Sequence, residues 1–251
     1  MAAAEPIELA GGPPPFVGRG GEKLRAALGR FELDVRGRRA LDAGASTGGF
    51  TDCLLQAGAA SVVAIDVGRG QLHERLRADP RVTNLERTDI RSVTLATVGG
   101  APVDVVTADL SFISVVRAVP VLVGEVAVAG APVVVLVKPQ FEAGRAEASR
   151  GRGVIRDPEV HRRTLGEVAG ALEASGAAIM GAMPSPITGS AGNIEFLLYA
   201  RTRPATDPGR PPPEDGADGP TGDGPHRTPG AAVSGLLDEA VAEAHRHDPR
   251  G

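Results

Sequence analysis

Short runs of apolar residues alternate along this chain with longer segments in which apolar residues recur every three or four positions. The runs are typical of buried strands, and the periodic segments predict helices. After an apolar lead-in at 40–41, strands are expected at 62–66, 82–85, 103–108, 133–137, 177–184 and 193–200. Helices are expected at 24–31, 50–58, 71–77, 114–127 and 158–175. This alternation favours an open α/β sheet, in which ligands bind at the carboxyl ends of the strands.

The segment 41–50, LDAGASTGGF, joins the first predicted strand to the helix that follows it. Its three glycines allow the backbone to approach a ligand closely, because no Cβ intervenes. The spacing Asp-x-Gly-x-x-x-Gly-Gly differs from Gly-x-Gly-x-x-Gly, so a dinucleotide pyrophosphate loop is a poor fit. Asp42 at the strand end suits a cationic or polar ligand better than a diphosphate. A strand–turn–helix with a structural role only is the alternative interpretation.

Charged residues follow or flank several of the predicted strands. Asp66 lies about 20 residues past the glycine turn, where an acidic side chain can accept both hydroxyls of a ribose. Asp89 follows the next strand and either contacts an adenine or caps a helix. Lys138 comes directly after five apolar residues, so it is either a functional lysine or one that extends to solvent from a strand end. Glu195 begins the last strand, as an edge carboxylate or as an active-site group.

Lysine is rare in this chain: of its 27 basic residues only two are lysines, Lys23 and Lys138. An ammonium group can lose its proton, whereas a guanidinium group cannot, so a retained lysine points to chemistry. Asp109 and Lys138 end neighbouring strands, Lys23 precedes the first strand, and Glu195 starts the last one. We expect these four groups on one face of the sheet. Such a set can align a hydroxyl and help to remove its proton without a metal.

Charge and cysteine content limit the classes of protein to which the chain can belong. The net charge of −4 divides into +1 for residues 1–203 and −5 for 204–251, so a nucleic-acid-binding surface must be a local patch. The arginine-rich segments 19–39 and 145–163 are candidates for that patch. The single cysteine, Cys53, excludes a disulfide framework and fits a reducing cytoplasm. We find no signal peptide and no membrane span in the sequence.

Composition divides the chain into three regions. Residues 1–15 are small, polar and proline-rich, as in a linker, and residues 16–203 contain all of the elements above. Residues 204–251 form an acidic, Pro/Gly-rich tail that cannot bury a core and is expected to be disordered. A short helix at 233–245 is possible there, although it would be marginal if isolated.

Several strings, in this order, resemble the FtsJ-like family of RNA ribose 2′-O-methyltransferases, and most closely its TlyA-type, haemolysin-A-like rRNA methyltransferase group. They are FVGRGGEKL at 16–24, LDAGASTGGFTD at 41–52, AIDVGRGQL at 64–72, ERTDIR at 86–91, ADLSFIS at 108–114, VLVKPQFE at 135–142, GVIRDP at 153–158 and GNIEFLLY at 192–199. The resemblance implies a Rossmann-like class I methyltransferase with a mostly parallel seven-stranded sheet and an antiparallel last strand. It also implies a cytoplasmic enzyme that uses S-adenosyl-L-methionine and binds ribosomal RNA or ribosomal subunits, with no membrane partner.

The resemblance assigns roles to individual residues. The residues that it implies for cofactor binding are Gly44, Ala45, Ser46, Gly48, Gly49, Phe50, Asp66, Asp89 and Asp109. Those implied for catalysis are Lys23, Asp109, Lys138 and Glu195. The expected reaction is methyl transfer to a ribose 2′-hydroxyl of ribosomal RNA, with cytidine as the family's usual target.

Two departures from the family pattern are visible. Gly18 stands where the family usually has a serine. Family members carry an N-terminal RNA-binding domain, and here only residues 1–15 occupy its place. Either the lineage has lost that domain or the true start lies upstream. The alternatives are a methyltransferase for a small molecule or protein and a non-catalytic cofactor-binding relic, and the two retained lysines argue against the relic. A membrane-lytic protein is disfavoured, because the sequence offers no transmembrane helix and no basic amphipathic helix with bulky apolar residues.

Overall fold

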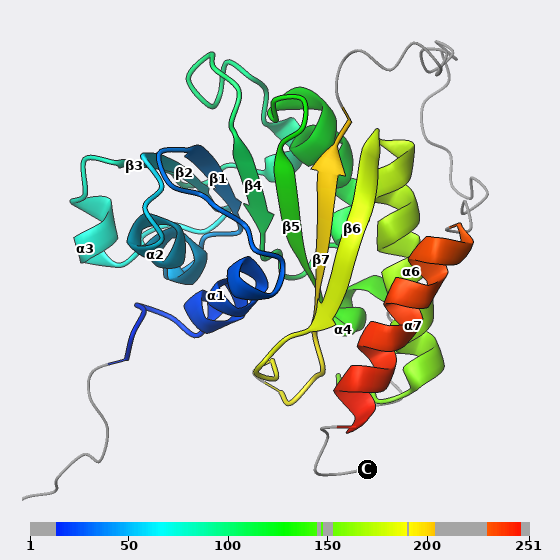
Figure 1. Ribbon diagram of the computed structural model, residues 1–251. Helices are drawn as coiled ribbons and strands as arrows, with labels where there is room; N and C mark the ends of the chain where they lie inside the picture. Colours follow the sequence, from blue (N-terminus) through cyan, green and yellow to red (C-terminus); the bar gives the residue numbers. More distant parts are fainter. Residues whose placement is uncertain (1–13, 145–146, 148–152, 190, 204–229, 247–251) are drawn as a thin grey trace, which may run out of the picture.

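The computed structural model describes residues 14–144, 147, 153–189, 191–203 and 230–246. Its centre is a seven-stranded sheet in the order β3-β2-β1-β4-β5-β7-β6, with helices on both faces (Figure 1). The strands are β1 (Arg39–Ala43), β2 (Ser61–Ile65), β3 (Val82–Leu85), β4 (Val105–Ala108), β5 (Pro132–Val137), β6 (Ala177–Pro184) and β7 (Phe196–Thr202). The first five run parallel, and β7 is antiparallel to β5 and to β6. The predicted Rossmann-like sheet with an antiparallel last strand is thus confirmed.

The central strands are apolar runs because both of their faces are covered. All six residues of β5 and all four of β4 are buried. Successive side chains of β5 enter opposite layers of the core. Val134 belongs to the core cluster that contains Leu24 and Leu54, whereas Val135 belongs to the cluster that contains Leu165.

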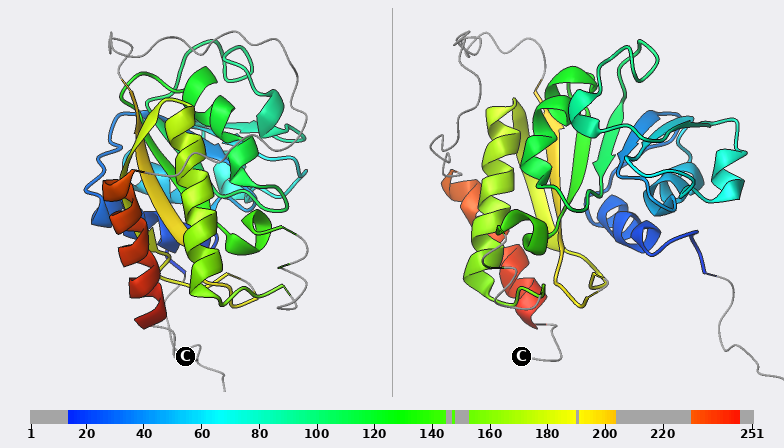
Figure 2. Two further views of the ribbon diagram at one scale, coloured as in Figure 1. Left: turned by 90° about the vertical axis from the view of Figure 1, so that its right-hand side faces the viewer. Right: turned by 180° about the vertical axis from the view of Figure 1, so that it is seen from behind.

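Helices cover the two faces in separate layers, which the two further views in Figure 2 show. The α-helices are α1 (Gly20–Arg30), α2 (Gly49–Gln56), α3 (Glu74–Arg77), α4 (Pro139–Glu142), α6 (Pro158–Ala174) and α7 (Ala231–Arg246). The core of one face contains residues of α1 and α2, and that of the other contains residues of α6 and α7. None of the helices in the described part of the chain has the length and apolar character needed to cross a bilayer.

Two of the predicted helices are shorter or less regular in the structure. Instead of one helix at 114–127 there is a 3₁₀ turn, η2 (Val115–Arg117), and then a π-helical segment, η3 (Pro120–Glu125). Pro120 has no amide hydrogen to donate to the preceding turn, and its ring is accommodated only at the start of a helix. The predicted helix at 71–77 is limited to α3.

The C-terminal region differs from the sequence prediction. The helix expected at 233–245 spans Ala231–Arg246 and packs against β6 and α6. Leu237, Ala240, Val241 and Ala244 on its inner face are buried. Residues 230–246 therefore belong to the packed unit, which the sequence prediction ended at 203. The predicted disorder of 204–229 and most of the predicted linker 1–15 lie outside the described residues.

Candidate active site

The ends of β1 and β4 bring the glycine turn and Asp109 together. The last residues of these parallel strands, Ala43 and Ala108, are paired. Gly44 and Asp109 are the next residues along each strand, and the Asp109 amide donates to the carbonyl of Ala43 at 2.9 Å. Asp109 therefore lies at the mouth of the glycine turn, as the order of the strands predicts.

The register of β5 with β7 brings in two further predicted residues. The last residue of β5, Val137, is paired with the first residue of β7, Phe196. Because the two strands are antiparallel, the next residue after Val137, Lys138, and the residue before Phe196, Glu195, leave the sheet at the same edge. The glycine turn, Asp109, Lys138 and Glu195 thus follow one another along the carboxyl edge of the parallel strands.

The turn between β1 and α2 requires glycine at two positions. Gly44 has φ +84°, and a Cβ there would lie 2.5 Å from the carbonyl oxygen of Asp109. Gly48 has φ +99°, and a Cβ there would lie 2.2 Å from Leu76. An L-side chain would be both strained and obstructed at either position. Glycine at these two positions therefore lets the turn pack closely against Asp109 and Leu76.

Two cavities adjoin this turn. The larger, of about 400 Å³, is lined by residues that include Gly44, Ser46, Asp66 and Asp89. The smaller, of about 220 Å³, is lined by Gly20, Gly44, Ala45, Ser46, Thr47, Gly49, Phe50, Asp109, Ser111 and Lys138. Of the residues predicted to hold the cofactor, only Gly48 lines neither cavity; it is the N-cap of α2. The larger cavity is within the size range of small-molecule sites.

Asp66 is held in place by the turn itself. Its Oδ2 accepts the amide of Ser46 at 2.8 Å, and its Oδ1 accepts the amide of Gly68 at 2.7 Å. Each carboxylate oxygen can accept a second hydrogen bond. Asp66 is thus oriented at the cavity wall with acceptor capacity for a diol.

Asp89 has a double role in the geometry. It caps the short 3₁₀ helix η1 (Ile90–Ser92) by accepting the Arg91 amide at 2.9 Å, as one of the two sequence interpretations required. It also forms an ion pair with the Arg91 side chain at 2.5 Å. The hydrogen bond from that side chain is the main reason that the pKa of Asp89 lies below its usual value. Asp89 also lines the larger cavity, and its contact with an adenine stays a prediction.

Asp42 lies beneath the glycine turn and is fully buried. Its Oδ2 accepts the hydroxyl of Thr51 at 2.6 Å, and among the described residues its Oδ1 has no hydrogen-bond partner. Burial raises the pKa of this carboxyl to about 7, and the negative charge of Asp109 adds to the effect. A buried carboxyl with a raised pKa thus lies in β1, two residues before Gly44.

Lys138 and Asp109 form the first of two ion pairs. Lys138 Nζ lies 2.5 Å from Asp109 Oδ1 and donates to Ser111 Oγ at 2.8 Å. The lysine is almost completely buried, with 8% of its surface exposed, so it does not extend into solvent. Because all three residues line the smaller cavity, the ammonium is fixed beside the glycine turn.

Lys23 and Glu195 form the second ion pair, which is more enclosed. Lys23 extends from α1, and its Nζ contacts Glu195 Oε2. Both residues are buried, and a Cβ on Gly189 would lie 2.5 Å from Glu195 Oε1. Gly20, one helical turn before Lys23, lines the same cavity as Lys138. The four predicted catalytic residues are thus two adjacent ion pairs, and their catalytic roles stay predictions.

A comparison with protein families decides the relationship. The model of the FtsJ-like methyltransferase family matches residues 16–202. The chain belongs to this family.

Individual relatives agree. The 16S/23S rRNA (cytidine-2′-O)-methyltransferase TlyA of Mycobacterium tuberculosis is 50% identical over 188 residues, which cover 75% of this chain and 69% of that protein. The Bacillus subtilis protein YqxC is 45% identical over 194 residues, or 77% of this chain and 68% of its own. A solved structure from Streptococcus thermophilus that carries the name hemolysin superposes with a TM-score of 0.79 at 36% identity, covering 94% of this chain and 76% of that one. The TlyA-type resemblance is therefore confirmed.

Within this FtsJ-like domain the sequence prediction missed several residues of the site. Ser111 binds Lys138, and Phe112 beside it is 89% exposed with φ +68°. The ring of Phe112 lies 5.4 Å from that of Phe141, centroid to centroid, at the rim of the larger cavity. Glu142 holds the same segment, because its carboxylate accepts the Ser114 hydroxyl at 2.5 Å and the Val115 amide at 2.9 Å. The strings ADLSFIS and VLVKPQFE contain these residues, but only the fold brings them into contact.

Proposed function

We propose that this chain transfers a methyl group from S-adenosyl-L-methionine to the 2′-hydroxyl of a ribose in ribosomal RNA, with cytidine as the target nucleoside. The observation that carries the proposal is the Lys138–Asp109 pair, which lines the same cavity as the glycine turn. Membership of the FtsJ-like family supports methyl transfer, and the name of the M. tuberculosis relative supports the substrate.

The residues around the turn fit this cofactor. The open face at Gly44 and Gly49 admits the amino-acid portion, and Asp66 offers carboxylate acceptors to a ribose diol. The bound cofactor supplies an electrophilic methyl group on a sulfonium. The protein then has to hold that group and a hydroxyl oxygen in line, and to keep water out.

Lys138 is the residue placed to act on the hydroxyl. A ribose hydroxyl is a weak acid, so an acceptor for its proton assists its attack on the methyl carbon. Held by Asp109 and Ser111, Lys138 Nζ would orient the hydroxyl oxygen towards the methyl group, and it would accept the hydroxyl proton when the amine is unprotonated. Asp109 stabilises the resulting ammonium, and Ser111 fixes its direction. The Lys23–Glu195 pair supports this group from the adjoining strand.

Phe112 supports an RNA substrate over a small molecule. An exposed aromatic ring at the cavity rim offers a stacking surface for an unpaired base, and its positive φ is the kind of strain that is found at functional sites. The contact with Phe141 and the clamp by Glu142 hold its segment in place. A nucleotide drawn out of the RNA could therefore stack on Phe112 while its ribose lies beside Lys138.

The test is tritiated methyl transfer from S-adenosyl-L-methionine to intact small and large ribosomal subunits that lack the modification. Digestion to nucleosides and mass spectrometry would identify the product, which we expect to be 2′-O-methylcytidine. Lys138→Ala is the control for transfer by the proposed site. Label on a base or on ribosomal protein would overturn the ribose assignment. Cofactor binding without any transfer would instead favour the small-molecule or relic interpretation.

A further inference from the structure

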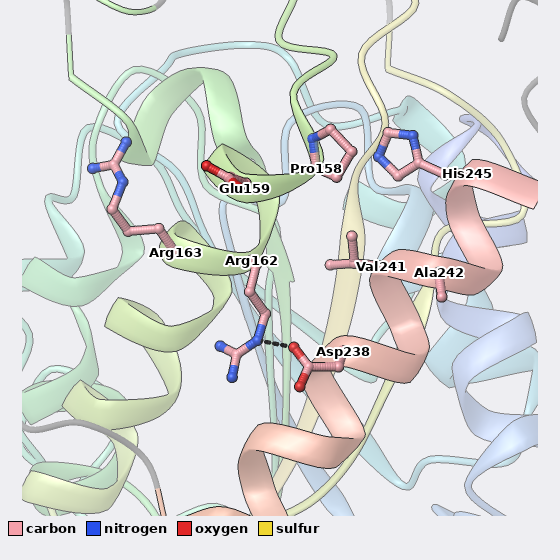
Figure 3. Close-up of a pocket in the computed structure, with 8 residues that line it drawn as sticks. All are labelled: Pro158, Glu159, Arg162, Arg163, Asp238, Val241, Ala242 and His245. Atoms are coloured by element: carbon pink, nitrogen blue, oxygen red, sulfur yellow. Dashed lines mark hydrogen bonds and ion pairs between the residues drawn. The ribbon is translucent and has the colours of Figure 1, made fainter.

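The C-terminal helix α7 lies outside the range matched by the family model, yet it contacts elements on both faces of the sheet. Towards α1 its Glu243 lies 3.6 Å from Arg30. Towards α6 its Asp238 forms an ion pair with Arg162, drawn in Figure 3. Figure 3 also shows His245 near the end of α7, beside the first residues of α6. Helix α7 therefore covers the outer edge of the sheet, at β6.

His245 makes a defined contact with a fully buried histidine of α6. His161 Nδ1 lies 3.0 Å from His245 Nε2, and His161 Nε2 lies 3.1 Å from the carbonyl oxygen of Ile155. A carbonyl oxygen only accepts, so the proton of a neutral His161 resides on Nε2 and its Nδ1 is an acceptor. His245 must then donate from Nε2. The hydrogen bonds thus fix the tautomers of both rings.

Two contacts lead from His161 to Glu195. In the first, Asn193 accepts the Ile155 amide at 2.9 Å and donates to the Gly153 carbonyl at 2.8 Å. In the second, the His161 ring packs edge-on against Phe196, with centroids 5.3 Å apart. Asn193 and Phe196 stand on either side of Glu195 in the sequence. His161 therefore supports the strand entry that carries Glu195 from both sides.

We propose that His245 is a positioning residue for the active site: by donating to His161 it fixes the Ile155–Asn193 contact and the Phe196 ring, and so holds Glu195 against Lys23. The effect on catalysis rests on the proposed function, because it requires Glu195 to support the methyl-transfer site. The His161–His245 contact itself does not depend on the proposed function. Helix α7 is then part of the catalytic unit, although no residue of α7 lines either cavity.

The charges around His161 agree with a neutral, donating and accepting ring at physiological pH. Its pKa is lowered to about 4, mainly by burial; the Ile155 carbonyl acts in the opposite direction, His245 contributes to the lowering, and Asp157 opposes it. Asp157 is itself engaged, because it caps α6 by accepting the Glu159 amide at 2.9 Å. Above its pKa the His161 ring is therefore neutral, and its Nδ1 can accept the hydrogen bond from His245.

The experiment compares three variants of the full chain. His245→Leu removes the donor, His245→Gln retains an N–H at the corresponding place, and Asp238→Asn weakens a different contact of the same helix. With ribosomal subunits as substrate, we expect His245→Leu to lower kcat about tenfold, because small displacements far from the chemistry reduce rates. KM for the subunit and Kd for S-adenosyl-L-methionine should not change. His245→Gln should restore most of kcat, and Asp238→Asn should match the wild type.

A second measurement needs no substrate. We expect the Ile155 amide, which donates to Asn193, to exchange with solvent deuterium about tenfold faster in His245→Leu than in Asp238→Asn. Equal exchange in the two variants would overturn the positioning role. So would equal kcat, or an equal loss in His245→Gln and His245→Leu. A wild type that methylates no RNA would refute the proposed function, and the exchange rates would still decide whether His245 fixes this contact.

Discussion

The two ion pairs of the site contain the same residue types, a lysine and a carboxylate, but their surroundings differ. Lys138 and Asp109 line a cavity beside the glycine turn, with Ser111 as a further partner of the lysine. Lys23 and Glu195 are enclosed, and the segments around Glu195 are held by Asn193 and Phe196. The comparison teaches that a lysine–carboxylate pair gains its role from what it faces. The first pair faces a cavity, and the second is enclosed by the protein.

The surroundings of the two ion pairs also contain buried groups whose effects on stability change with pH in opposite directions. Under the glycine turn, burial raises the pKa of Asp42 to about 7, so raising the pH introduces a charge that burial disfavours. His161 supports the segment around Glu195, and burial lowers its pKa to about 4. Lowering the pH towards 4 therefore places a positive charge on a ring whose burial disfavours it. Variants of Asp42 alone and of His161 alone can therefore separate the two effects of pH on stability.

The largest effect is expected at the Lys138–Asp109 pair, which lines the cavity. Lys138→Ala should lower methyl transfer by about 10²–10⁴-fold, because it removes the group that we propose orients the hydroxyl and accepts its proton. Cofactor affinity, measured by calorimetry, should stay within about twofold of the wild type. Asp66→Ala is the control, since it should weaken cofactor binding. A loss of cofactor affinity in Lys138→Ala as large as in Asp66→Ala would contradict the assignment.

The enclosed pair should affect stability most. Glu195→Gln leaves the Lys23 ammonium buried without its counter-charge, which should cost about 3–5 kcal/mol of the free energy of unfolding. The measurement is chemical denaturation at pH 7.5. Adding Lys23→Met to Glu195→Gln removes the buried charge and should recover much of the stability but not the activity. A single variant as stable as the wild type would show that water reaches the pair.

His161 should give a stability change with a defined direction in pH. Its folded-state pKa of about 4 lies below the unfolded value of about 6.5, so the folded state binds fewer protons. The resulting stability is fully present above pH 6.5 and is lost as the pH falls towards 4, up to about 3 kcal/mol. Denaturation of wild type and His161→Gln at pH 7.5 and 4.5 should show the larger loss in the wild type.

Asp42 should give a change in stability with pH in the opposite direction, and Asp42→Asn tests it. The folded-state pKa of Asp42, about 7, lies above its unfolded value, so its contribution is greatest below about pH 3.9 and declines as the pH rises to 7. Between pH 4.5 and 7.5 the wild type should therefore lose stability relative to Asp42→Asn. The same direction of change in both variants would refute the contrast between Asp42 and His161.

The smallest effect on stability is expected at Phe112, which lines the larger cavity. Because 89% of its surface is exposed, Phe112→Ala should change the free energy of unfolding by less than about 0.5 kcal/mol. If a base stacks on the ring, the same change should weaken subunit binding by about 1–3 kcal/mol. Phe16→Ala, a buried aromatic outside the cavities, is the comparison for stability. Unchanged subunit binding in Phe112→Ala would exclude the stacking role.

The sequence predicted most of the fold because the central strands are covered on both faces. Apolar runs such as 133–137 are then nearly unambiguous, and the residue after each run falls at the ligand-binding edge. Asp66, Asp109 and Lys138 could be placed at that edge for this reason. Pairing of Lys23 with Glu195 depends on the insertion of β7 between β5 and β6, which no local pattern specifies.

The remaining contacts also depend on tertiary structure. The roles of Ser111, Asn193 and His161 were not predicted, since each binds a partner that lies on a different element. Helix α7 has weak local signals and was expected to be marginal. Its buried face became visible only with β6 and α6 beside it. Local periodicity thus predicts the helices and strands, whereas the contacts between them depend on how they pack.

The position of β7 has a consequence for the order in which the enzyme matures. Lys23 and Glu195 are separated by 172 residues, and Glu195 reaches the site only when β7 pairs with β5. Because a chain is synthesised from its N-terminus, β1 to β5 emerge and can assemble before Glu195 has been made. An unfinished chain can therefore present a glycine turn and the Lys138–Asp109 pair while the second ion pair is still missing. If Glu195 takes part in catalysis as predicted, the chain becomes active only after β7 has been synthesised and paired, later than the cavity beside the glycine turn has formed.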